Sequence, residues 1–241
     1  MSAHGSAGTL VARPRERARA RPEGYGTLAR LRRTTLRRAP VLVSVVFLLV
    51  LAVVALVVPL LPVPDPTSQS VLDRLQPPSA EHPFGTDRLG RDILSRALWG
   101  ARLSLVVGLG VVALSGTVGT AFGVLAGYVR GWPSGLLARL IDILLAFPPL
   151  ILAMVTVTVL GNTVLTVVLA ISAGMVPRFA RVARGTVLAV REREFVEAAR
   201  TVGASTPRII VCHVLPNAID PIIVLCTLLV PTAILTEALL S

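Results

Sequence analysis

The stretch PVLVSVVFLLVLAVVALVVPLL, from Pro40 to Leu61, contains no charged residue and decides the fold class. A helix that crosses a membrane needs about 20 mostly apolar residues, which is the length of this run. A basic region precedes it, as in a signal peptide, but that region covers residues 1–39 and no small-residue cleavage site follows the run. We therefore predict an uncleaved first transmembrane helix at 40–61.

The composition extends this prediction to the whole chain. Of the 241 residues, 54% are hydrophobic and 15% are charged, and the mean hydropathy is +0.76. Soluble domains have about 45–50% apolar and about 25% charged residues. Further apolar stretches cover Leu103–Val129, Leu140–Leu160, Thr163–Val182 and roughly Val214–Leu240. The sequence thus predicts an all-α membrane protein with five spans.

The arginines predict the orientation of these spans. Residues 1–39 hold ten arginines and two acidic residues, and residues 176–208 hold seven and three. Residues 62–102 hold five of each. Because positively charged segments stay inside, the first two segments should be cytoplasmic and the third external. We expect a basic cytoplasmic N-terminal tail (1–39), a first transmembrane helix (40–61), an extracytoplasmic segment (62–102) and a core (103–241) with a cytoplasmic loop at about 185–208.

Several classes of function are excluded by the sequence. The chain contains no lysine and no glycine-rich phosphate loop, so we expect no nucleotide hydrolysis by this chain. The two cysteines, Cys212 and Cys226, and the scattered histidines do not have the spacing of a metal site. The basic tail lacks aromatic residues for base stacking, so contact with anionic lipid headgroups is favoured over nucleic-acid binding. The sequence shows no nucleophile–base cluster of the kind that would indicate an enzyme.

A stripe of small residues marks the second span. Ser115, Gly119, Gly123 and Gly127 recur at every fourth position, which places them on one face of a helix. Such a face allows two helix backbones to approach closely in a membrane. The partner helix could belong to the same chain or to another subunit, and the sequence favours neither.

Prolines and acidic residues indicate a possible translocation path. Pro148-Pro149 in the third span, and Pro216 and Pro221 in the fifth, should kink or break their helices. Irregular backbone in a membrane survives only where protein or a water-filled cavity satisfies it. Acidic residues within spans usually face a cavity or a partner, although Glu237 could also lie at the outer interface. The candidate path residues are Phe147, Pro148, Asp220 and Glu237.

The cytoplasmic segment Arg191–Gly203 reads as a short amphipathic helix. Phe195, Ala198, Ala199 and Val202 recur at helical spacing as one apolar stripe. Gly203 suits the left-handed residue that ends a helix, and Ser205-Thr206-Pro207 offers a start for the next one. The stripe could dock into a groove of another protein or lie on the bilayer surface.

Two motifs resemble one family. Glu197-Ala198-Ala199, followed by Gly203 and by Leu215-Pro216, resembles the EAA loop of permease subunits of ATP-binding-cassette importers. His82–Asp92, continuing through Gly100-Ala101-Arg102, resembles the external segment of dipeptide, oligopeptide and nickel permeases, in particular the C-type permease. The resemblance covers roughly Arg32 to Ser241.

This resemblance implies a type I ABC importer transmembrane domain with six spans. Ser241 precedes the expected sixth span, so either the sequence is truncated, which we expect, or the protein is an atypical member without that span. In the family, the EAA loop forms a coupling helix in a cleft of the ATPase. The residues to which the resemblance assigns this docking are Arg193, Glu194, Phe195, Glu197, Ala198, Ala199, Gly203 and Ala204.

The resemblance also implies partners and a location. A paralogous permease subunit, two ATP-binding subunits that hold ATP and Mg, and an extracytoplasmic binding protein would complete a bacterial inner-membrane importer, with the N-terminus of this chain cytoplasmic. This chain itself would need no cofactor. The implied cargo is di- or oligopeptides, with nickel complexes also carried in the family. A stand-alone channel or secondary carrier without an ATPase partner is the alternative.

Overall fold

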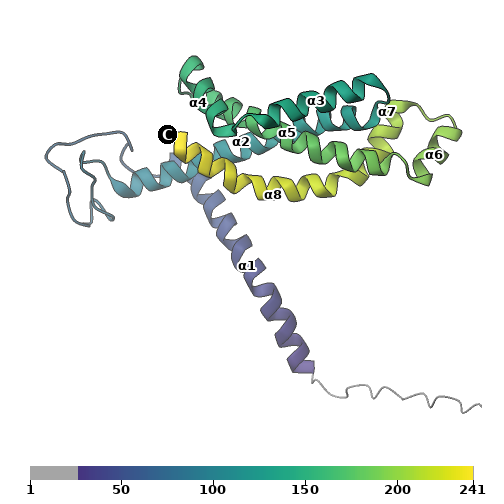
Figure 1. Cartoon of the computed structure of the whole chain (residues 1–241). Coiled ribbons are helices and arrows are strands. Elements are labelled where there is room, and N and C mark those ends of the chain that lie inside the picture. Colours follow the sequence, from purple (N-terminus) through teal and green to yellow (C-terminus); the bar gives the residue numbers. More distant parts are fainter. Residues whose placement is uncertain (1–26, 241) are drawn as a thin grey trace, which may run out of the picture. The chain divides into compact units, whose positions relative to one another are not determined.

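The structure, a computed structural model, describes residues 27–240, with side chains described from Pro40 onward. All regular elements in this range are helical, which confirms the predicted all-α class (Figure 1). They are α1 (Thr27–Val57), the 3₁₀ turn η1 (Val58–Leu60), α2 (Ile93–Tyr128), α3 (Trp132–Ala146), α4 (Pro149–Leu160), α5 (Val164–Val190), α6 (Glu194–Thr201), α7 (Thr206–Ile209), the π-helical turn η2 (Ile210–Val214) and α8 (Leu215–Leu240). The arginines of residues 13–21 lie outside the described residues.

Four of these segments are long and apolar enough to cross a membrane, and a fifth span arises if the α3–α4 pair is counted as one. That pair is bent by 83° at Phe147 and Pro148. The prolines explain the bend, since a proline restricts the residue before it to extended backbone and removes a helical hydrogen bond. The predicted break in the third span is therefore confirmed.

Several helix boundaries differ from the predictions; α3, for example, begins at Trp132, eight residues before the expected start at Leu140. The helix α2 begins at Ile93, ten residues before the expected start at Leu103, because Asp92 caps it: its carboxylate accepts a hydrogen bond from the Ser95 amide at 2.6 Å. The helix α1 begins at Thr27, so residues 27–39 of the predicted tail are helical. The helix α5 continues beyond Val182 to Val190. Each of these helix ends contains arginine, so none of them belongs to an apolar run.

The prolines near α8 act differently from those at the α3–α4 bend. The turn η2, which precedes Pro216, has the wider π-helical form, a distortion typical of sites where the regular hydrogen-bond ladder is interrupted. From Leu215 onward, α8 runs unbroken through Pro221 and Pro231, so the break considered for this span is absent there.

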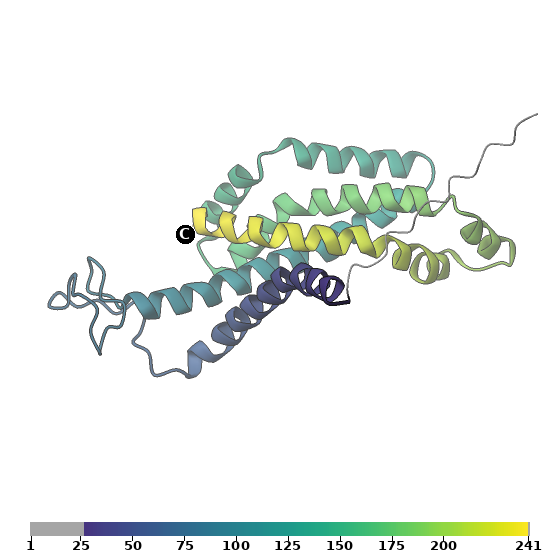
Figure 2. The ribbon, with the colours of Figure 1, turned by 90° about the horizontal axis from the view of Figure 1, so that it is seen from below.

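The core lies where α2, α5 and α8 pack together, and Figure 2 shows α8 beside the other two. Phe179 and Val111 are fully buried at its centre. Lipid is as apolar as these side chains, so close van der Waals packing, rather than escape from water, holds such helices together.

The small-residue stripe of α2 contacts α5 of the same chain. A Cβ atom on Gly119 would lie 2.5 Å from the Val176 carbonyl oxygen, and one on Gly123 would lie 2.4 Å from that of Ala180. Gly127 faces Val187 in the same way, and Ser115 is buried with its hydroxyl donating to the Val111 carbonyl. The structure thus places the stripe in the packing within this chain.

Candidate functional site

The connection between α5 and α8 contains the short helix α6. It begins at Glu194, three residues later than the expected start at Arg191, because Arg191 and Glu192 form a turn. The amide of Arg193 closes this turn by donating to the Val190 carbonyl at 3.1 Å. The helix lies at the end of the bundle, beyond α7 (Figure 1).

One side of α6, here called its inner face, consists of Val196 and Ala199 and is packed against the bundle. Val196 has no exposed surface. It belongs to a cluster with residues from α2, α5, α7, η2 and α8, and Ala199 and Ala204 pack partly buried against the same cluster. The buried members of this cluster are Val124, Val187, Val190, Val196, Ile209, Val214 and Ala218. This packing fixes α6 to both neighbouring spans.

Polar contacts fasten the same loop to the end of α2. The Arg200 guanidinium lies 5.5 Å from the centre of the Tyr128 ring, which is cation–π distance. The Arg191 side chain donates to the Gly127 carbonyl at 2.6 Å, a contact that also satisfies one of the free carbonyls at the helix end. The loop is therefore held by α2 as well as by α5 and α8.

The other side of α6, here called its outer face, consists of Phe195, Ala198 and Val202, all exposed. Val202, at the end of the helix, is 89% exposed. The carboxylates of Glu194 and Glu197 and the residue before the helix, Arg193, are also exposed. The predicted apolar stripe is thus divided: Ala199 turns partly inward, and the other three members form an uncovered apolar surface.

Val196 was missed because Phe195 and Val202 suggested a single stripe. The spacing of Val196 and Ala199, three residues apart, was a signal for a second face. In a helix of eight residues, both faces can look apolar, and only the packing of the loop decides which is buried.

Gly203 ends α6 with φ at +84°, in the left-handed region, as predicted. Its amide donates to the Arg200 carbonyl at 2.9 Å, and nothing lies near the position of a Cβ atom. The next helix begins at Thr206 with Pro207 in its first turn, and Ser205 precedes it without a side-chain capping bond.

The His82–Asp92 motif, which the sequence predicts to be external, forms a compact loop in front of α2. Asp87 accepts hydrogen bonds from the amides of Leu89 and Arg91, at 2.8 and 3.0 Å, and ion pairs with Arg91 and Arg96. Desolvation raises the pKa of Asp87, but the hydrogen bonds and the Arg91 charge together hold it well below its ordinary value. Asp92 contacts the His82 imidazole at 3.1 Å besides capping α2.

Comparison with known proteins identifies the family. The family model described as "Binding-protein-dependent transport system inner membrane component" matches residues 119–241. The chain belongs to this family. It is therefore a permease subunit of an ABC importer, a non-catalytic, multi-pass component of the inner membrane. This membership decides against a stand-alone channel or secondary carrier.

Individual relatives can be aligned with most of the length of this chain. A Brucella suis protein named as a peptide transport system permease is 41% identical over 209 residues, which is 87% of this chain and 70% of the relative. The dipeptide transport system permease protein DppC of Alkalihalophilus pseudofirmus is 43% identical over 83% of this chain and 66% of its own length. The glutathione transport system permease protein GsiD of Escherichia coli O6:K15:H31 is 40% identical over 68% and 54%.

The candidate path residues of the permease lie in two parts of the chain, at the α3–α4 bend and on α8. Phe147 is 56% exposed at the end of α3, and Pro148 precedes α4. Asp220 is exposed on α8. Glu237, in contrast, is 6% exposed and accepts a hydrogen bond from Ser104 of α2 at 3.0 Å, so it is packed between α2 and α8. Asp220 and Glu237 therefore lie on different sides of α8.

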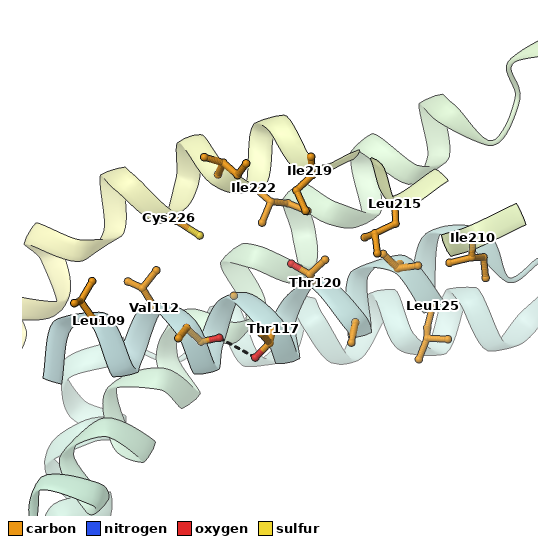
Figure 3. A pocket seen from close by; sticks show the side chains of 15 residues that line it. Leu109, Val112, Thr117, Thr120, Leu125, Ile210, Leu215, Ile219, Ile222 and Cys226 are labelled. Atoms are coloured by element: carbon orange, nitrogen blue, oxygen red, sulfur yellow. Dashed lines mark hydrogen bonds between the residues drawn. The ribbon is translucent and has the colours of Figure 1, made fainter. Parts of the chain in front are cut away.

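The permease also has an open groove of about 780 Å³ between α2 and the η2–α8 segment (Figure 3). Apolar side chains such as Leu109, Val112 and Ile222 line it. Its few polar groups include Thr117, whose hydroxyl donates to the Ala113 carbonyl at 2.8 Å. Such a lining offers little to hold a polar or charged solute.

Proposed function

We propose that this permease is the C-type subunit of an importer for di- or oligopeptides. The names of the relatives support the cargo, since they include dipeptide and glutathione permeases. A paralogous permease, two ATP-binding subunits and an extracytoplasmic binding protein would complete the importer. The ATP-binding subunits would bind ATP and Mg. The fold would be that of a type I importer transmembrane domain, with α3 and α4 counted as one span.

One observation supports the coupling role most directly: the two faces of α6 are separated. The outer face and the Glu197 carboxylate are exposed at the end of the bundle, where an ATPase cleft could receive them. The inner face is anchored through Val196 to the ends of α5 and α8. A displacement of α6 by the ATPase would therefore move these spans as a body.

The charge distribution supports a cytoplasmic location of this loop and of the N-terminus. Residues 176–208 carry seven arginines against three acidic residues, whereas residues 62–102 are balanced. The external motif would then face the binding protein, and α6 would face the ATPase.

Charge reversal at Glu197 tests the proposal. Glu197→Arg places a positive charge on the docking surface without changing buried packing, since Glu197 is exposed. We expect ATP-dependent uptake of a labelled dipeptide into vesicles to fall at least about tenfold, the loss caused by one unfavourable contact of about 1.4 kcal/mol. ATPase subunits should also co-purify less well.

The matched control is Glu81→Arg, which makes the same charge change at an exposed position of the external segment. The amount of each variant in the membrane should equal that of the wild type. Unchanged uptake and unchanged ATPase binding for Glu197→Arg would contradict the coupling role. Wild-type vesicles that take up no peptide would contradict the cargo.

A further inference from the structure

The end of α2 is completed by side chains from other parts of the chain. The last carbonyl groups of a helix have no N–H donor within that helix. The Ala126 carbonyl accepts a hydrogen bond from the Ser134 hydroxyl of α3 at 2.7 Å. The next carbonyl, that of Gly127, accepts one from the Arg191 guanidinium at 2.6 Å. Because Arg191 stands between α5 and α6, the α6 loop supplies a cap for α2.

A second arginine of the α6 loop lies against the next residue of α2. The Arg200 guanidinium is 5.5 Å from the centre of the Tyr128 ring, and both side chains are half-buried. The carboxyl end of a helix carries a partial negative charge, so the end of α2 attracts both guanidinium groups. Arg191 precedes α6 and Arg200 lies in its last turn. The two arginines therefore tie both ends of α6 to consecutive residues of α2.

Glu192 orients the first of these arginines. Its carboxylate accepts a hydrogen bond from the Arg191 Nε at 2.9 Å and lies 3.3 Å from the Arg130 guanidinium. The Glu192 side chain is 57% exposed, so water screens these ion pairs and they contribute little by themselves. The Arg191 side chain is only 17% exposed, so its contact with the Gly127 carbonyl is the better protected one.

The apolar packing of α6 does not fix its direction. Val196 is fully buried and Ala199 partly so, but apolar attraction has no preferred direction. A displacement applied to the outer face of α6 would therefore turn this eight-residue helix about Val196 as well as move the bundle. Hydrogen bonds and cation–π contacts have a defined geometry, so one of each at opposite ends of the helix resists this rotation.

We propose that Arg191 and Arg200 are positioning residues for the coupling of ATP hydrolysis to transport. Their contacts with Gly127 and Tyr128, here called the α2 clamp, keep α6 from turning when the ATPase displaces it. The clamp rests on the proposed coupling role of α6 and adds the residues that make α2 follow the loop. Loss of the clamp leaves the outer face of α6 intact, so the ATPase still binds and hydrolyses ATP, but less cargo crosses for each ATP.

The ratio of dipeptide uptake to ATP hydrolysis tests the clamp in the assembled transporter, reconstituted in proteoliposomes. Arg191→Met removes the charged donor, and Arg191→Lys keeps one. Tyr128→Leu removes the aromatic ring, and Tyr128→Phe keeps it. Arg139→Met, at an exposed position of α3 outside the clamp, is the control for the loss of one positive charge. Hydrogen exchange of residues 194–206 is measured on the same samples and needs no cargo.

We expect exchange of these amides to be about tenfold faster in Arg191→Met and about threefold faster in Tyr128→Leu, because a hydrogen bond from a charged group contributes more than a half-buried cation–π contact. Uptake per ATP should fall in the same order, whereas co-purification of the ATPase should stay at the wild-type level. Arg191→Lys, Tyr128→Phe and Arg139→Met should remain close to the wild type in both measurements.

Unchanged exchange in Arg191→Met and Tyr128→Leu would show that these contacts do not hold α6 and would overturn the proposal. Faster exchange with an unchanged ratio of uptake to ATP hydrolysis would show a purely structural role and would overturn it equally. If Arg191→Met does not assemble, the comparison of Tyr128→Leu with Tyr128→Phe decides by the same two criteria. A wild-type transporter that hydrolyses ATP without taking up dipeptide would instead contradict the proposed cargo, and the exchange measurements would still decide whether the clamp holds α6.

Discussion

The loop before α2, here called the external loop after its proposed location, and the loop around α6 lie at opposite ends of α2, and each turns at a glycine with positive φ. They are held in different ways. The external loop is closed by hydrogen bonds and ion pairs that converge on Asp87, Thr86 and Asp92. The α6 loop is closed by buried apolar packing around Val196.

The difference relates to what each loop would do. A polar network fixes the shape of a loop in water, but exposed ion pairs contribute little stability individually. Close-packed apolar contacts resist displacement and move as one body. Under the proposed function, the α6 loop would therefore transmit a displacement as one body, and the external loop would present a defined surface.

The largest expected effect is on loop stability, when alanine replaces the glycine at each of the two turns. A Cβ atom on Gly90 would lie 1.8 Å from the Ser70 carbonyl oxygen, whereas one on Gly203 would meet nothing within 4 Å. Gly90→Ala should destabilise the external loop by about 3 kcal/mol or more, because steric overlap adds to the backbone strain. Gly203→Ala should cost about 1–2 kcal/mol from strain alone.

Hydrogen exchange of residues 70–92 and 194–206 in detergent measures both effects, with the wild type as the reference. Equal effects of the two substitutions would contradict the difference in crowding.

A smaller effect is expected on the two valines of the α6 loop. Val196→Ala removes two buried methyl groups and should destabilise the loop by about 2 kcal/mol. Val202→Ala, at a position 89% exposed, should change stability by no more than about 0.5 kcal/mol. Thermal unfolding of the purified variants checks this pair.

The order of the two variants should reverse in ATPase binding, where Val202→Ala should have the larger effect. Val202→Ala should weaken co-purification of the ATPase although it leaves the fold unchanged. If Val202→Ala is as destabilising as Val196→Ala, the assignment of inner and outer faces is wrong.

The smallest expected effect is a pH dependence confined to the external loop. Because the folded-state pKa of Asp87 is lowered, its contribution to stability is complete above the ordinary value of 3.8 and is lost as the pH falls through and below that value. Limited proteolysis of the external loop should therefore accelerate below about pH 4.

Asp87→Asn should remove most of this pH dependence by making the loop equally susceptible at neutral pH. Cleavage in the α6 loop serves as the internal control. A wild-type external loop whose susceptibility is the same at pH 3 and pH 6 would contradict the role of Asp87.

The sequence was sufficient where a single residue dictates the backbone. Gly203 predicted the left-handed end of α6, and Pro148-Pro149 predicted the break between α3 and α4. In both cases, the local chemistry leaves few alternatives.

The sequence was insufficient where distant packing decides. Which side of α6 is buried depends on Val187, Val214 and other residues far along the chain, so Val196 was missed. The start of α2 at Ile93 depends on the Asp92 cap, within a charged segment that the arginine counts assigned to the exterior. The contact between Ser104 and Glu237 joins residues 133 positions apart and has no local signal.

The central claim is that the outer face of α6 contacts the ATPase while the external loop does not. Photo-cross-linking from a benzophenone side chain at Val202 or at Leu72, which is 92% exposed in the external loop, tests it directly in the assembled transporter. We predict a cross-link to the ATP-binding subunit from position 202 and none from position 72. Absence of that cross-link from 202, or its appearance from 72, would contradict the account.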